Sequence, residues 1–151
     1  MKQILILLTG GMLISASIKA QTPEDSVKAV VNQLFTAMKN ADAGMLKDAF
    51  ADSAVLQTIR RRADGNFFVQ SEQVSGFVSQ ISMAKKDSLD ERITFETVKI
   101  DGPLAIAWTP YKFYYAGKFS HCGVNSFQLV RINGRWKIQF LIDTRRRQNC
   151  E

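Results

Sequence analysis

The sequence predicts an α+β fold, because helical patterns come first and a long run of strand patterns follows them. Near the start of the chain, apolar residues recur at the spacing of one helix face, at Val27, Val30, Val31, Leu34, Phe35 and Met38. The last half instead contains apolar alternation broken by turn signals, of which Asn133-Gly134 is the strongest. Strands joined by such short turns pair antiparallel, so we expect a meander packed against helices.

The N-terminal segment has the layout of a secretory signal peptide. It contains a positive start at Lys2, an apolar stretch and a cleavage point after Ala20. The alternative is a transmembrane anchor, but a span needs about 20 apolar residues, and this run is shorter and ends in Lys19. We therefore expect residues 1–20 to be removed, and residues 21–151 to form one periplasmic or secreted domain without a membrane anchor.

The formal net charge is +6, and loss of Lys2 and Lys19 lowers it to +4. Mild basicity concerns solubility and encounter with anions rather than fold. Nucleic acid is not an expected partner, because export takes the protein away from it. Two basic runs, Arg60-Arg61-Arg62 and Arg145-Arg146-Arg147, either converge into an anion site or form a solvated, salt-screened edge.

Local signals place the elements of the first half. Thr22 can cap a helix whose first residue is Pro23, and Asp25 puts a carboxylate at the helix N-terminus. This helix is expected to end at Asn40, and Asp42 then caps a short second helix. The patterns that follow predict a strand, a polar turn, a return strand and a third helix, over residues 53–59, 60–66, 67–69 and 71–83.

The meander is expected to contain four strands, over residues 91–100, 104–115, 119–132 and 135–144. The Asn133-Gly134 turn fixes the register of the last two strands. It places Leu129 opposite Ile138, Phe127 opposite Phe140, Asn125 opposite Ile142 and His121 opposite Arg146. On this register, Asn125 and His121 extend along the buried face of the sheet.

A second two-residue turn, Ala116-Gly117, sets the register of the preceding strand. It places three residues on the buried face, namely Leu104, Ile106 and Trp108. Pro110 can sit at a bulge, and a bulge there would reverse the faces of the residues after it. The inward orientation of either Tyr111 or Lys112 therefore stays open at this point.

The predicted buried face is apolar at its base and polar at one end, where Trp108, Asn125 and His121 lie. A concave apolar pocket with a few convergent polar groups is the usual form of a ligand site. We expect this one to bind a small molecule, aromatic or anionic. Tyr111 and Arg146 complete the expected contacts, because an aromatic ring stacks on a flat ligand and an arginine fork binds a carboxylate or phosphate.

These patterns resemble the NTF2-like superfamily, whose members include ketosteroid isomerase, scytalone dehydratase and SnoaL-type cyclases. The resemblance runs from the first helix to Gly134-Arg135-Trp136-Lys137-Ile138. More narrowly, residues 108–111, 117–123 and 143–146 are similar to a bacterial subgroup described as "putative lumazine-binding". The resemblance implies a cone, with three N-terminal helices packed in a strongly curved, mostly antiparallel sheet. It also implies a pocket at the open end and, commonly, a homodimer through the outer sheet face.

The catalytic set of the isomerase type does not transfer to this chain. Its first helix offers Phe35 and Met38 to the pocket but no tyrosine, and Asp52 is better suited to a cap or turn than to a general base. His121, the single histidine, is the catalytic candidate, because its ordinary pKa lies near neutrality. The alternative is a structural histidine. Asp143 could pair with it only if a bulge turned that carboxylate inward.

Two cysteines, Cys122 and Cys150, could form a disulfide in an oxidising compartment. The alternative is a buried thiol at Cys122 and a frayed tail. One histidine and two separated cysteines do not have metal-ligand spacing, and no cofactor is expected. Three functions follow: a binding module for a small molecule, an isomerase, dehydratase or cyclase that uses His121 as acid and base, and a dimeric interaction module.

Overall fold

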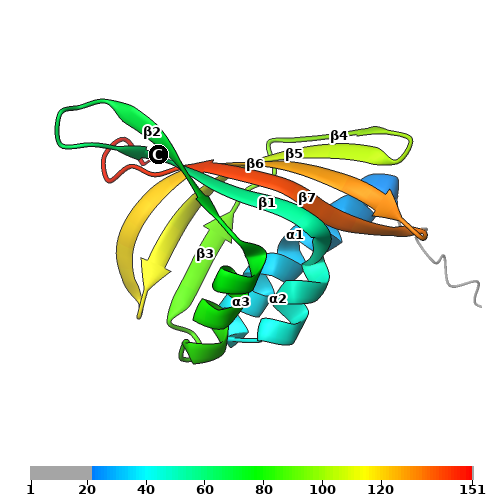
Figure 1. Cartoon of the computed structure of the whole chain (residues 1–151), viewed down its shortest axis with the longest axis horizontal. Coiled ribbons are helices and arrows are strands. Elements are labelled where there is room, and N and C mark those ends of the chain that lie inside the picture. The colour runs from blue at the N-terminus through cyan, green and yellow to red at the C-terminus, as the bar shows by residue number, and fades with distance from the viewer. Residues whose placement is uncertain (1–21, 151) are drawn as a thin grey trace, which may run out of the picture.

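Three helices lie in the concave side of a curled, unclosed sheet in the computed structural model, which describes residues 22–150 (Figure 1). The expected signal peptide over residues 1–20 lies outside the described residues. The helices are α1 (Pro23–Asn40), α2 (Ala43–Ala49) and α3 (Val74–Met83). The α+β cone expected from the sequence is confirmed.

Seven strands form the sheet: β1 (Phe50–Arg61), β2 (Phe67–Glu72), β3 (Leu89–Ile93), β4 (Thr97–Asp101), β5 (Leu104–Tyr115), β6 (Lys118–Ile132) and β7 (Arg135–Thr144). Their order is β2-β1-β7-β6-β5-β3, and β4 pairs with the first half of β5. All pairs are antiparallel except β1 with β7. The single strand expected over residues 91–100 is two strands, because the regular pairing with β5 is interrupted at residues 94–96, where the Thr94 and Glu96 N–H groups still donate to the Pro110 and Trp108 carbonyls.

The helix caps form as the sequence predicts. Thr22 Oγ1 accepts a hydrogen bond from the Asp25 backbone N–H at 3.1 Å, and the Asp25 carboxylate accepts one from the Thr22 N–H at 3.0 Å. This reciprocal capping box satisfies two backbone donors. Asp42 caps α2 by accepting from the Met45 N–H at 2.8 Å. Both caps fix where the helices begin, and so which of their faces meet the sheet.

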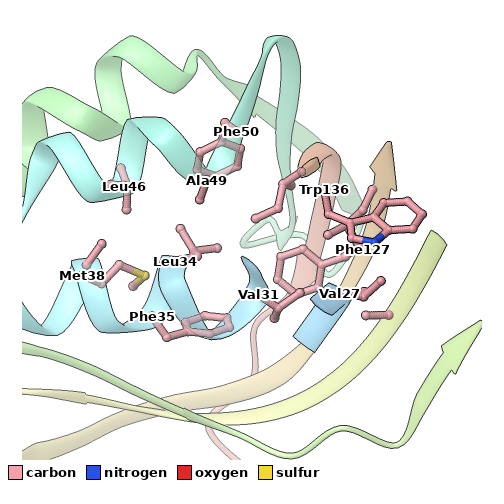
Figure 2. Close-up of a cluster of buried hydrophobic side chains, with 14 of the residues drawn as sticks. Val27, Val31, Leu34, Phe35, Met38, Leu46, Ala49, Phe50, Phe127 and Trp136 are labelled. Atoms are coloured by element: carbon pink, nitrogen blue, oxygen red, sulfur yellow. The ribbon is translucent and has the colours of Figure 1, made fainter. Parts of the chain in front are cut away.

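The core lies between α1, α2 and the inner face of the sheet (Figure 2). Val27, Val31 and Leu34 form one face of α1 and are fully buried. Phe127 of β6 is also fully buried, and Phe35 meets its ring edge-to-face at 6.2 Å. Burial of each large apolar side chain contributes about 1.5–3 kcal/mol. The helical periodicity of the first helix therefore predicts the core side of α1 correctly.

A bulge in β7 changes the expected register between β6 and β7. Leu129 pairs with Ile138 as predicted, but the register then shifts by one residue. Asn125 therefore lies opposite Asp143 rather than Ile142. Because a shift of one residue moves a side chain to the other face, the bulge turns Asp143 inward. His121 does not face Arg146, which instead forms a bridge with Cys122.

A second bulge, in β6, overturns the prediction for β5. The Ala116-Gly117 turn pairs Tyr114 with Phe119, but Phe113 then pairs with His121. The pairing opposite Pro110 is regular, so the bulge is not at the proline. The expectation that Leu104, Ile106 and Trp108 are buried is wrong, since their exposed fractions are 47%, 42% and 45%. The inner face of β5 instead carries Ala105, Ala107, Thr109 and Tyr111, all buried.

Candidate functional site

A pocket of about 230 Å³ lies between α1, α3 and the inner face of the sheet. Its apolar wall comes mainly from the two helices and from β3, β5 and β7, and includes Leu34, Phe35, Met38, Phe77, Phe113 and Leu141. Its polar end comes from β3, β6 and β7, and includes Glu91, His121, Asn125, Asp143 and Arg145. The pocket therefore has an apolar wall, to which both the helices and the sheet contribute, and a polar end on the sheet.

Asp143 is the centre of one half of the polar end. Its Oδ2 accepts a hydrogen bond from the Tyr111 hydroxyl at 3.0 Å and from Arg145 Nε at 2.9 Å. Arg145 also donates to Thr58 Oγ1 of β1 at 3.3 Å. The carboxylate is buried, and a buried carboxylate needs both a cation and hydrogen-bond donors. Arg145 supplies the cation and Tyr111 a hydroxyl donor, so the negative charge of Asp143 is balanced within the protein.

Glu91 is the centre of the other half. Its Oε1 accepts a hydrogen bond from Asn125 Nδ2 at 2.8 Å, and among the described residues no cation forms an ion pair with it. Burial, together with the negative charge of Asp143, raises the pKa of Glu91 to about 7 against the opposing effects of Asn125 and Arg145. The neutral, protonated form of Glu91 is therefore populated near neutral pH.

His121 lies on the pocket wall between two aromatic rings. Its ring centroid is 5.7 Å from that of Tyr111 and 5.0 Å from that of Phe113. Its Nδ1 lies 3.0 Å from Ser120 Oγ. Burial, together with the nearby charge of Arg145, lowers the pKa of His121 below its ordinary value. The imidazole is therefore mainly neutral at pH 7, and acts as an aromatic wall with one hydrogen-bonding edge.

The structure brings only part of the expected site together. Asn125 and His121 line the pocket. Tyr111 does not line it, but its hydroxyl donates to Asp143, which does. Trp108 is on the outer face of the sheet, because the β6 bulge reverses the expected register. Arg146 is also outside the pocket, where its Nε donates to the Asn149 carbonyl at 3.1 Å. The neighbouring Arg145 takes the inward position instead.

The two basic runs do not converge into one anion site. The first lies on the β1–β2 hairpin, where Arg60 donates to Gln70 and Arg61 to the Gly65 carbonyl. Arg62 lies over the Phe68 ring, with 5.0 Å between the guanidinium and the ring centroid. From the second run, Arg145 reaches the pocket. The two runs nevertheless lie at one end of the molecule, because β1 and β7 run parallel.

Sequence reasoning misses Glu91 and Arg145. A signal for Glu91 exists, since it has the same parity as Ile93 and Phe95, which point toward the core. A carboxylate on the apolar side of an alternating strand is a candidate functional group. Burial of a charge costs free energy, and buried ionisable groups are concentrated at functional sites. No comparable signal distinguishes Arg145 from Arg146, because the difference depends on the β7 bulge.

A disulfide joins Cys122 of β6 to Cys150 in the C-terminal tail, with 5.7 Å between their α-carbons. The backbone groups of Cys122 and Arg146 also exchange two hydrogen bonds, of 2.9 and 2.8 Å. The tail is thus held against the outer face of β6, directly after Arg145. Within residues 22–150, no cluster of metal-binding side chains is present, and no helix is long and apolar enough to span a membrane.

The curled sheet wrapped around three helices has the NTF2-like fold, which solved NTF2-like proteins of unknown function share. More particularly, the chain belongs to the family described as "Putative lumazine-binding", whose model matches residues 22–139. No curated protein matches the chain at a significant level.

Solved structures agree on the fold. A domain of unknown function with a cystatin-like fold from Nostoc punctiforme PCC 73102 is 15% identical, with a TM-score of 0.65, and the match covers 87% of this chain and 82% of that one. An NTF2-like protein of unknown function from Shewanella oneidensis MR-1 is 14% identical, with a TM-score of 0.63 and coverage of 82% and 99%. A protein from Streptomyces avermitilis, described as a putative dehydratase of the NTF2-like family, is 14% identical, with a TM-score of 0.60 and coverage of 83% and 99%. At these identities the likeness concerns the fold alone.

Proposed function

We propose that this protein binds a small organic molecule in the pocket between its helices and the inner face of its sheet. The proposal rests on one observation. Four polar side chains line the same end of a largely apolar pocket, namely Glu91, Asn125, Asp143 and Arg145. This combination is typical of ligand sites. The family description supports the proposal, because it too names a small molecule, lumazine.

Calorimetric titration with lumazine and a panel of small aromatic compounds tests this function. Asn125→Leu keeps the size of the side chain but removes the amide that holds Glu91, so we expect binding to weaken about tenfold or more. Gln148→Leu is the control, because Gln148 is exposed in the C-terminal tail, away from the pocket lining and from the proposed dimer surface. The pocket is not the site if no compound binds, or if both variants weaken binding equally.

We further propose that the protein is exported to the periplasm or secreted, with residues 1–20 as a cleaved signal peptide. The Cys122–Cys150 disulfide supports this, because disulfides persist mainly in oxidising compartments. Cell fractionation followed by mass measurement of the intact chain tests the proposal. A cytoplasmic chain that retains Met1 would contradict it.

A second candidate function is acid–base catalysis of the isomerase, dehydratase or cyclase type in the same pocket. The sequence suggests His121 as the acid and base. The structural observation that favours catalysis concerns Glu91 instead. The Glu91 pKa of about 7 suits a general base at neutral pH. Deuterium uptake into the methyl group of 2-acetonaphthone, followed by NMR, provides the assay. Loss of exchange in Glu91→Gln but not in His121→Ala supports Glu91. The opposite pattern supports His121, and no exchange in the wild type argues against this chemistry.

The outer face of the sheet supports a third candidate, a homodimeric interaction module. Five of its apolar side chains are at least 40% exposed, namely Val55, Leu104, Ile106, Trp108 and Ile132. An exposed apolar patch of this kind marks an interaction surface. We propose that two copies pack through it. Light scattering should give a dimer for the wild type and a monomer for Ile106→Lys/Trp108→Glu, and a monomeric wild type at high concentration would exclude this function.

A further inference from the structure

The polar end of the pocket has hydrogen-bonding atoms that the protein itself does not use. Among the described residues, Glu91 accepts one hydrogen bond, through Oε1, which leaves Oε2 without a partner. Arg145 donates through Nε to Asp143 and through one Nη to Thr58, and its other Nη has no hydrogen-bond partner in the described part of the chain. A ligand in the pocket therefore meets one carboxyl oxygen and one guanidinium edge.

The two carboxyl groups of the pocket differ in how their charge is compensated. Asp143 has a cation, Arg145, and a hydroxyl donor, Tyr111. Within residues 22–150, the donor to Glu91 is the neutral amide of Asn125 alone. A buried carboxyl group without a cation favours its neutral form, and a neutral carboxyl group is a hydrogen-bond donor. When environments separate two neighbouring carboxyl groups in this way, the two have different roles.

We propose that the ligand is an aromatic carboxylate, held between the guanidinium of Arg145 and a protonated Glu91, so that binding takes up a proton. This inference rests on the proposed binding function and names the ligand class. The ligand carboxylate would accept one hydrogen bond from each group. The aromatic rings of Phe35, Phe77 and Phe113, which line the same pocket, suit a flat aromatic body.

The arginines at one end of the sheet favour the approach of an anion, whereas the pocket lining itself carries three carboxyl groups, Glu72, Glu91 and Asp143, and one guanidinium, Arg145. Arginines of both basic runs lie at the end of the molecule where β1 and β7 finish side by side. A surface of one sign raises the local concentration of small ions of the opposite sign. A cationic ligand could pair with Glu91, but it would approach against these arginines and meet Arg145 in the pocket.

The groups that face Glu91 determine how binding depends on pH. Asn125 of β6 donates to it, Asp143 and Arg145 act on it from the β7 side, and His121 of β6 lines the same pocket. Tyr111 of β5 lies behind Asp143, and Glu72 of β2, which accepts from Gln80, lines the far wall. From α1, Lys39 pairs with the neighbouring Asp90 instead. Near pH 7, His121 is mainly neutral and Arg145 stays charged, so the proton expected to move is that of Glu91.

Three compounds of one shape test the ligand class in calorimetric titrations of the wild-type protein. They are 2-naphthoate, which is anionic, 2-naphthamide, which is neutral, and 2-naphthylmethylamine, which is cationic. We expect 2-naphthoate to bind most tightly. We also expect its affinity to fall about tenfold from pH 6 to pH 8, because Glu91 then loses its proton while the ligand stays ionised. Titration in two buffers of different ionisation enthalpy measures the proton uptake directly.

Variants separate the two contacts. Glu91→Gln mimics the protonated side chain, so it should keep the affinity for 2-naphthoate and lose the pH dependence. Arg145→Gln should weaken 2-naphthoate about tenfold or more and change 2-naphthamide little. Arg146→Gln is the matched control with the same loss of charge outside the pocket, and should change neither compound by more than about twofold.

The wild-type titrations decide the proposal even if a variant does not fold. Tighter binding of the amide or the amine overturns the ligand class while the binding function stands. An affinity for 2-naphthoate that does not change with pH, or that comes without proton uptake, overturns the role of Glu91. An equal loss in the two arginine variants overturns the contact with Arg145. Failure of all three compounds to bind counts against both the ligand class and the pocket itself.

Discussion

The Tyr111 hydroxyl donates a hydrogen bond to the Asp143 carboxylate at 3.0 Å, although β6 lies between their strands. The Thr144 carbonyl oxygen lies 2.9 Å from the same hydroxyl, so the two acceptors share its single proton. The phenol can cross the intervening strand because its pairing partner on β6 is Gly123, which has no side chain. The β7 bulge turns Asp143 inward to receive it. The polar end of the pocket thus depends on one glycine and one bulge.

Gly123→Ala should destabilise the fold by about 1–3 kcal/mol or more. A Cβ atom at this position would lie 1.8 Å from the Thr144 carbonyl oxygen and 2.8 Å from Tyr111 Cε1, so backbone and ring must both move. Denaturant unfolding measures the loss. Gly76→Ala is the matched control, since its Cβ would meet only the Glu72 side chain, at 3.7 Å, and alanine favours the helix. Equal stability of the two variants would contradict the proposed role of Gly123.

Tyr111→Phe should cost about 1–3 kcal/mol of unfolding free energy, because it leaves the buried Asp143 carboxylate with one donor fewer. It should also weaken ligand binding, since Asp143 positions Arg145. Thermal unfolding and calorimetric titration measure the two effects. Tyr115→Phe, at an exposed tyrosine, should change stability by less than about 0.5 kcal/mol. A Tyr111→Phe variant as stable as this control would show that the hydroxyl has no structural role.

The elements of this fold are well determined by local signals. Thr22 and Asp42 start the first two helices by side-chain capping, and the turns at Ala116-Gly117 and Asn133-Gly134 have the positive φ angles that two-residue hairpins need. Local patterns also predict the range of β5 and β7 to the residue. These features depend on neighbours in sequence, so one chain is enough to find them.

Which face of a strand points inward is less predictable, because each bulge reverses the orientation of the side chains that follow it. The register next to each turn is as expected, and Leu129 does lie opposite Ile138. After the bulges, Trp108 faces outward and Asp143 inward. Sheet curvature over three helices requires such bulges, but their positions depend on tertiary packing rather than on a local signal. For this reason the sequence locates Asn125 and His121 in the pocket but misplaces Trp108 and Arg146.

Glu91→Gln should change how stability depends on pH. The folded pKa of Glu91 is about 7, and its ordinary value is 4.5. Between these values the folded protein keeps a proton that the unfolded chain releases, so the stability contributed by the neutral carboxyl group is present below about pH 4.5 and lost as pH rises to 7. Relative to Glu91→Gln, the wild type should therefore lose up to about 3 kcal/mol over this range. Denaturant unfolding at pH 5 and pH 7.5 measures the difference.

The control for this prediction is Glu96→Gln, because Glu96 is exposed in the segment between β3 and β4. Its pH profile should parallel that of the wild type. If the Glu91→Gln profile is parallel to it as well, Glu91 does not titrate differently in the folded and unfolded states, and the proton uptake proposed for ligand binding loses its basis.

Cys150→Ser should lower stability by about 3 kcal/mol, because the disulfide closes a loop between residues separated by 28 positions. The loss should extend to the pocket, since the tail that the disulfide holds begins directly after Arg145, whose guanidinium pairs with Asp143. Thermal unfolding with and without dithiothreitol measures the stability, and titration with 2-naphthoate measures the effect on the pocket. Reductant should lower the wild type to the level of Cys150→Ser and leave the variant unchanged. A wild type insensitive to complete reduction would show that the two backbone hydrogen bonds between Cys122 and Arg146 hold the tail without the disulfide.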